Sequence, residues 1–191
     1  VGVGVGWSPE EYANLGAAER YHVRGAYLDE SIRLWRHLWS GATWPFEGRF
    51  EAFTDFVFEP LPVQPGGPPI LVGGRSEAAY RRAGTVGDGY HFSTVPPSAL
   101  GERLGVVRAA AANEGRPMPP VSGRVTVAFD ATAFPAGVAW ASIGSAEAIA
   151  ADMRAYAAAG VAHVALILRE TDPARYVAIA ERFAREVIPL V

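Results

Sequence analysis

The chain has 191 residues, enough for one domain with its own core; half of them are hydrophobic and 19% are charged. The net charge of -3 argues against a nucleic-acid or anionic-membrane surface. The lack of cysteine excludes disulfides, thiolate nucleophiles and cysteine metal sites. No apolar run approaches the ~20 residues of a membrane span, and the N-terminus has no charged signal-peptide region. These features predict a cytoplasmic protein that binds neither nucleic acid nor membranes.

The chain opens on VGVGVGW, residues 1–7, which has the pattern of a buried strand. Ser8 and Pro9 follow, with a glutamate three residues after the serine, and this pattern predicts a helix start. A longer helix is expected over residues 26–40, because apolar residues recur there at helical spacing, and Gly41 ends it.

Residues 41–68 are rich in proline and aromatic residues, and the prolines of EPLPVQPGGPP exclude a helix there. We interpret this segment as an insertion within a single domain of residues 1–191, because neither flank alone makes a complete α/β unit. The rest of the chain alternates between short apolar stretches and helical patterns. Strands are expected at 69–72, 87–93, 125–129 and 161–168, and helices at 76–84, 96–113, 145–159 and 172–187.

This alternation is typical of a parallel sheet buried beneath helices. The pattern gives about five strand-helix units, whereas a closed (β/α)₈ barrel has eight strands and about 250 residues. Two arrangements stay open: an open sheet with the first strand at an edge, or the C-terminal portion of a barrel. A natural short protein and a longer protein whose start was removed are both compatible with the pattern.

Four stretches resemble the bacterial luciferase-like oxidoreductases: GVGVGW, DESIRLWRHLW, FEGRFEAF, and PPILVGGRSEAAYRRAG followed by GDGY. The resemblance covers nearly the whole chain. It implies a TIM-barrel fold, (β/α)₈-derived and lacking about the first three β/α units, since the glycine-rich opening is the fourth barrel strand of the family. It also implies F420 or FMN as cofactor and a homodimer, for which the aromatic segment 44–58 is the expected interface.

Gly73, Gly74, Arg75 and Ser76 lie where a predicted strand ends and a helix begins. Backbone N–H groups at a helix start bind phosphate, glycine permits close approach, and Arg and Ser add donors. The alternative is a tight turn with a helix cap. The resemblance favours cofactor binding, because luciferase-like enzymes place the cofactor phosphate near this turn.

Gly4 and Gly6 are expected to let a cofactor ring or ribityl chain lie against the end of the first strand, with Trp7 on the same face. The alternative is close packing of small residues. Some F420-dependent sugar-phosphate dehydrogenases of the family carry an acid directly after these glycines. Trp7 stands there in this chain, which argues against that substrate class.

His91, near the end of its strand, is the candidate catalytic residue, although a lone histidine is more often a satisfied, partly buried side chain. His163 begins its strand and is expected to be structural. Asp88, between two glycines, is expected to bind backbone N–H groups in a turn. Asp29 and Glu30 are expected in helix-to-loop salt bridges. No histidine spacing indicates a metal site.

The resemblance thus implies an oxidoreductase that transfers hydride between F420 or FMN and a small organic substrate, with F420 preferred. One alternative is an FMN-dependent monooxygenase. Another is a non-catalytic or truncated cofactor-binding subunit. A third, an unrelated phosphate-binding barrel, is less favoured, because a chain without lysine has no Schiff-base chemistry.

Overall fold

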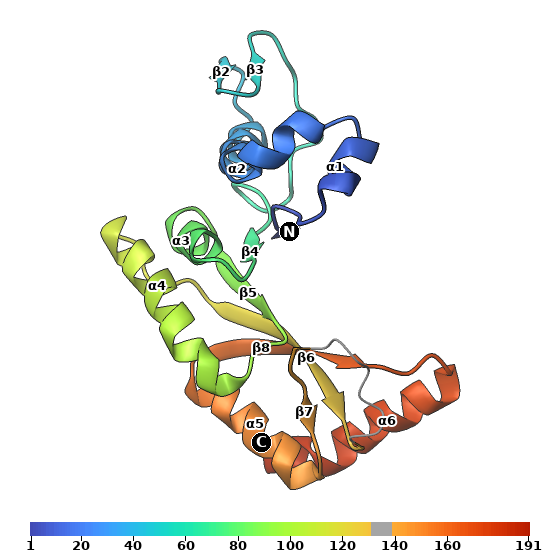
Figure 1. Ribbon diagram of the computed structural model, residues 1–191. Coiled ribbons are helices and arrows are strands. Elements are labelled where there is room, and N and C mark those ends of the chain that lie inside the picture. Colours follow the sequence, from blue (N-terminus) through green and yellow to red (C-terminus); the bar gives the residue numbers. More distant parts are fainter. Residues whose placement is uncertain (131–138) are drawn as a thin grey trace.

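A parallel sheet forms the centre of the computed structural model, which describes residues 1–130 and 139–191 (Figure 1). Its strands pair in the order β1–β4–β5–β6, and β6 also pairs with β7 and β8. Every pairing within this sheet is parallel. The strands are β1 (Gly2–Val3), β4 (Leu71–Gly73), β5 (Gly89–Ser93), β6 (Val121–Ala128), β7 (Ser142–Ile143) and β8 (Val161–Leu168).

Four helices, α1, α3, α5 and α6, begin at side-chain caps that the sequence indicates, whereas α2 and α4 have no side-chain cap. Ser8, Ser76, Ser145 and Asp172 each accept a hydrogen bond from the backbone N–H three residues further on, a cap worth about 1 kcal/mol. The helices are α1 (Pro9–Asn14), α2 (Arg24–Trp39), α3 (Glu77–Thr85), α4 (Leu100–Asn113), α5 (Ala146–Ala158) and α6 (Pro173–Glu186), with 3₁₀ turns η1 (Ala18–Val23), η2 (Pro97–Ala99) and η4 (Ile188–Leu190).

The main core lies between the sheet and the helices α3, α4 and α5. Successive strand residues face opposite sides of a sheet. On β5, Tyr90 and Phe92 are therefore buried in the core, whereas His91 and Ser93 belong to the opposite face. This alternation places the polar residues of β5 on the sheet face that the core does not cover.

The strand expected at residues 125–129 is β6, which begins four residues earlier, at Val121, and ends at Ala128. Its first half carries Ser122 and Arg124 on one face and the small Gly123 on the other, so it lacks an apolar run. The sheet is open among the described residues, because β1 pairs only with β4 and β8 only with β6. No closed barrel forms within residues 1–130 and 139–191.

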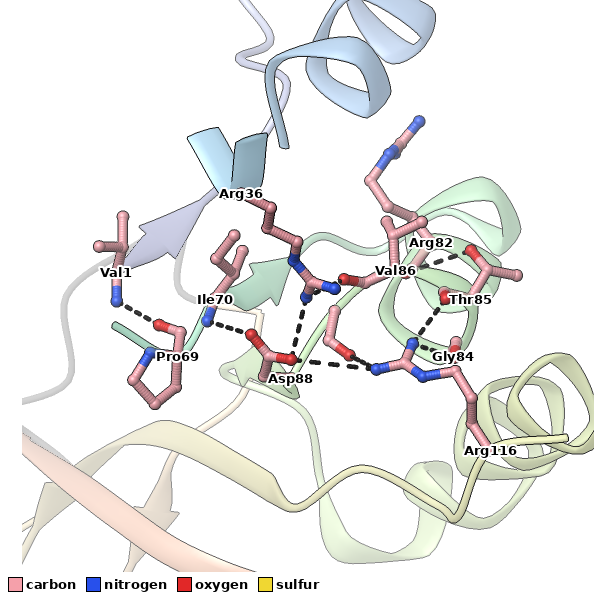
Figure 2. Close-up of polar contacts among 11 residues, drawn as sticks. Val1, Arg36, Pro69, Ile70, Arg82, Gly84, Thr85, Val86, Asp88 and Arg116 are labelled. Atoms are coloured by element: carbon pink, nitrogen blue, oxygen red, sulfur yellow. Dashed lines mark hydrogen bonds and ion pairs between the residues drawn. The ribbon is translucent and has the colours of Figure 1, made fainter. Parts of the chain in front are cut away.

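Asp88 lies at the edge of the sheet where the parallel strands begin and links several elements there (Figure 2). Its carboxylate accepts the Ile70 N–H at 2.9 Å, so it binds a backbone N–H as predicted, but at the start of β4 and not within its own turn, and it pairs with Arg36 of α2 at 2.9 Å. Arg116, 3.9 Å from the same carboxylate, donates to three carbonyls around the end of α3, those of Gly84, Thr85 and Gly87. These contacts hold α2, α3 and the residues after α4 against the start of β4 and β5.

The insertion 41–68 contains a short antiparallel hairpin, β2 (Phe46–Glu47) and β3 (Ala52–Phe53), which lies beside α2 and away from the main sheet (Figure 1). Trp44 is 62% exposed, whereas Phe46 is buried. The homodimer interface expected in this segment stays a prediction. Across the described ranges, no helix is both long and apolar enough to cross a membrane.

Glu30 of α2 holds the hairpin in place. Only 3% of its surface is exposed, and its carboxylate accepts the backbone N–H groups of Arg49, Phe50 and Glu51. Arg33 lies 3.7 Å from the same carboxylate. The expected salt bridge is thus only part of the role of Glu30, since the loop is bound chiefly through its backbone.

Glu30→Gln is expected to make the stability of the protein depend less on pH between pH 7 and pH 3. Burial raises the pKa of Glu30, but the three N–H donors together outweigh burial and hold this pKa below its ordinary value of 4.5. When a carboxyl group has a lower pKa in the folded protein than in the unfolded chain, it stabilises the fold. This stabilisation is complete at pH values above the ordinary pKa and is lost as the pH falls through the pKa of the folded protein. Thermal unfolding from pH 7 to pH 3 measures the loss. Glu77→Gln, at an exposed ion pair with Arg81, is the control; parallel curves for Glu30→Gln and the wild type would refute this account.

Candidate functional site

A cleft of about 830 Å³ lies at the carboxyl ends of β1, β4, β5 and β6. In parallel α/β proteins this edge of the sheet carries the ligand sites. The structure brings together in this cleft every residue that the sequence indicates for the site: Gly4, Gly6, Trp7, Gly73, Gly74, Arg75, Ser76 and His91. Segments from opposite sides of the long insertion therefore meet at one place.

The Gly73–Ser76 turn forms one wall of the cleft. Gly74 has a φ of +146°, and a Cβ at this position would lie 2.5 Å from the Cβ of Ala79. Only glycine fits this turn without strain. Ser76 then caps α3, with its Oγ accepting the Ala79 N–H at 3.3 Å.

Gly4 and Gly6 line the facing wall and differ in their surroundings. A Cβ on Gly4 would meet only the Gly73 carbonyl oxygen, at 3.9 Å, so the strand end is open beside it. Gly6 has a φ of +68° and packs against Tyr12, whose hydroxyl donates to the Val5 carbonyl at 2.7 Å. Trp7 lies at the rim, 80% exposed.

Two arginines converge on the end of β5. Arg75 donates to Thr94 Oγ1 at 2.8 Å, and Arg124 of β6 donates to Ser93 Oγ at 2.8 Å. Among the described residues, neither guanidinium group pairs with a carboxylate, and no Asp or Glu lines the cleft. Arg82 also lines it but is neutralised by an ion pair with Asp29 of α2. The cleft therefore carries uncompensated positive charge, which suits an anionic ligand.

His91 lies deeper in the cleft, level with polar residues of the neighbouring strands. Its Nδ1 is 2.9 Å from Ser122 Oγ, and Ser122 pairs in register with His163 of β8. Burial lowers the pKa of His91, and the charges of Arg124 and His163 act in the same direction, so the imidazole is neutral at pH 7. His163, expected to be structural, is exposed.

Sequence reasoning missed Arg124, Ser93 and Thr94. Ser122, Arg124 and Thr126 alternate along β6, and this period of two was the available signal. Thr94 is the one non-glycine residue with positive φ, +52°, in the described part of the chain. The same part contains no group of three or more side chains suited to a metal ion.

The parallel sheet with a cleft at its strand ends defines an α/β protein, and its likeness to solved structures shows that this open sheet is of the TIM-barrel type. The solved structure of an F420-dependent secondary alcohol dehydrogenase superposes with a TM-score of 0.82 and 19% identity, covering 100% of this chain and 69% of that one. A monooxygenase from Streptomyces bottropensis gives a TM-score of 0.74 and 20% identity, covering 99% and 68%. At these identities the likeness shows the fold.

The model of the luciferase-like monooxygenase family matches residues 1–136, and the chain belongs to this family. An uncharacterised protein of Mycobacterium tuberculosis is 36% identical over 121 residues, which are 62% of this chain and 40% of that protein. An FMNH₂-dependent dimethylsulfone monooxygenase of Pseudomonas putida is 31% identical over 116 residues, 60% of this chain and 32% of that enzyme. The chain spans less than half the length of these relatives.

Proposed function

We propose that the cleft binds the phosphate-bearing cofactor F420 or FMN and that the chain serves hydride transfer to or from a small organic substrate. The observation that carries this proposal is the pair of arginines without carboxylate partners beside a glycine turn at the start of α3. Membership of the luciferase-like family supports it, because the family comprises flavin- and F420-dependent oxidoreductases and monooxygenases. When bound, the cofactor supplies the redox chemistry, and the protein binds and orients it.

The residues of the cleft fit such a cofactor. A volume of about 830 Å³ lies within the range of pockets for ligands of this size. Arg75, Ser76 and Arg124 would hold the phosphate, and the open strand end at Gly4 would accept the ring or ribityl chain. We favour F420, because its several negative charges suit a cleft that arginines line and that no carboxylate of residues 1–130 and 139–191 lines.

His91 is our candidate for contact with the substrate. Its Nδ1 is engaged with Ser122, which leaves Nε2 for a ligand in the cleft. Because the pKa is lowered, the neutral imidazole offers this nitrogen as a hydrogen-bonding group at pH 7. An FMN-dependent monooxygenase remains the second candidate, favoured by the sequence relative from Pseudomonas putida.

Ser76→Asp is expected to weaken binding of both cofactors about tenfold or more, because it adds a negative charge beside the phosphate. Aspartate caps helices as well as serine does, so α3 keeps its start. Ser145→Asp makes the same change at the cap of α5, away from the cleft, and is the matched control.

The measurement is a fluorescence titration with F420 and, separately, FMN. Flavin emission and quenching of the rim residue Trp7 report binding independently. The proposal fails if the folded wild type binds neither cofactor, or if Ser145→Asp weakens binding as much as Ser76→Asp does.

A further inference from the structure

Two buried tyrosines hold the Gly73–Ser76 turn through its carbonyl groups. Tyr90 of β5 donates its hydroxyl proton to the Gly74 carbonyl at 3.1 Å, and Tyr80 of α3 donates to the Arg75 carbonyl at 2.8 Å. The two rings meet edge to face, with centroids 5.6 Å apart. Tyrosines from two different elements thus hold consecutive peptide groups of one turn.

The direction of these carbonyls fixes the direction of the neighbouring N–H groups. Both peptide bonds are trans, and in a trans peptide the N–H points opposite to the C=O. Because the carbonyls of Gly74 and Arg75 point toward the buried tyrosines, the N–H groups of Arg75 and Ser76 point away from them. Arg75 and Ser76 both line the cleft.

These two N–H groups have no acceptor among the described residues of the chain. The backbone and side-chain hydrogen bonds of the turn involve its carbonyls, the Ser76 hydroxyl and the Arg75 guanidinium, but not these amides. Adjacent amides that point the same way form a concave site for an anionic oxygen. The turn therefore offers two oriented donors to a ligand in the cleft.

We propose that Tyr80 and Tyr90 are positioning residues that hold the N–H groups of Arg75 and Ser76 toward the phosphate of the cofactor. This inference rests on the proposed function. Tyr90 stays a hydrogen-bond donor at every working pH, because burial and the neighbouring Tyr80 raise its pKa. The hydroxyls act through the backbone turn and do not themselves touch the phosphate.

Removing one hydroxyl is expected to weaken phosphate binding without moving the ring. Tyr80→Phe and Tyr90→Phe keep the aromatic packing and free one carbonyl each, so each is expected to weaken FMN binding about fivefold. Riboflavin, which lacks the phosphate, is expected to bind all of these proteins equally. F420 and its phosphate-free deazaflavin precursor form a second such pair.

Tyr156→Phe is the matched control. Tyr156 is also a buried tyrosine that donates to a backbone carbonyl, that of Val95, but it does not line the cleft. If the tyrosine hydroxyls only made the protein rigid, their loss would weaken the binding of FMN and riboflavin alike. Tyr156→Phe would then weaken FMN binding as much as Tyr80→Phe and Tyr90→Phe do. Either result would overturn the inference.

A measurement on the wild type removes any dependence on how the variants fold. In ¹⁵N-labelled protein, FMN is expected to shift the amide signals of Arg75 and Ser76 strongly, and riboflavin is expected to leave them nearly unchanged. Equal shifts with both ligands would overturn the inference even though binding itself succeeds. A wild type that binds neither FMN nor F420 would instead refute the proposed function.

Discussion

Gly84→Ala is expected to lower the free energy of unfolding by about 3 kcal/mol, because there is no space for a methyl group where α3 crosses α4. A Cβ on Gly84 would clash with the Val107 carbonyl oxygen and would lie 2.8 Å from both Ala110 Cβ and Ala111 N. Two of these three atoms belong to the backbone of α4, so no side-chain rotation relieves the clash. The helices would have to separate at the point where Arg116 binds the Gly84 carbonyl (Figure 2).

Gly105→Ala is the matched control and is expected to have the opposite sign. Gly105 lies inside α4, and a Cβ there would meet no atom within 4 Å. Alanine is favoured over glycine inside a helix, so this change should raise the free energy of unfolding by about 0.8 kcal/mol. Urea unfolding followed by circular dichroism measures both variants. Equal effects of the two changes would mean that helix propensity, and not the helix crossing, decides the outcome.

The starts of α1, α3, α5 and α6 could be predicted from the sequence because each rests on a contact between near neighbours. Ser76 and Ser145 bind N–H groups three residues away, and these caps are written in the local sequence. The Gly73–Ser76 turn could be predicted for the same reason, since two glycines and a cap lie within four residues. That this turn lies beside Gly4 follows from the parallel pairing of β1 with β4, which no local pattern indicates.

The start of β6 could not be predicted, because the reason for it lies in another strand. Gly123 is glycine because the ring of Phe92 occupies the space of its side chain. Arg124 enters the cleft through its register with Ser93, a contact across 31 residues. The contacts of Glu30 with the hairpin loop are likewise non-local. Glu30 binds three backbone amides that lie 19 to 21 residues later in the chain, and no spacing rule in the sequence predicts such a contact. Local sequence patterns predict helix caps and turns, but they do not predict contacts between residues that strand pairing brings together.

The double variant Arg75→Glu/Arg124→Glu is expected to weaken binding of F420 and FMN about 100-fold, through the reversal of both uncompensated charges in the cleft. The two guanidinium groups bind adjacent residues, Ser93 and Thr94, so their effects are expected to couple. The free-energy changes of the two single variants should then not sum to that of the double variant. Arg108→Glu, on the exposed surface of α4, changes the net charge by as much as each single variant and is the control for them.

Ionic strength separates this electrostatic effect from damage to the cleft. The Debye length falls from about 10 Å at 0.1 M salt to about 3 Å at 1 M, so salt should weaken binding to the wild type and narrow its difference from the double variant. Riboflavin, which carries no phosphate charge, should bind both proteins alike at all salt concentrations. If the double variant loses riboflavin as well, the two arginines support the shape of the cleft and not the charge of its ligand. If salt leaves the difference unchanged, the phosphate does not lie between Arg75 and Arg124, and the turn at Ser76 alone would have to bind it.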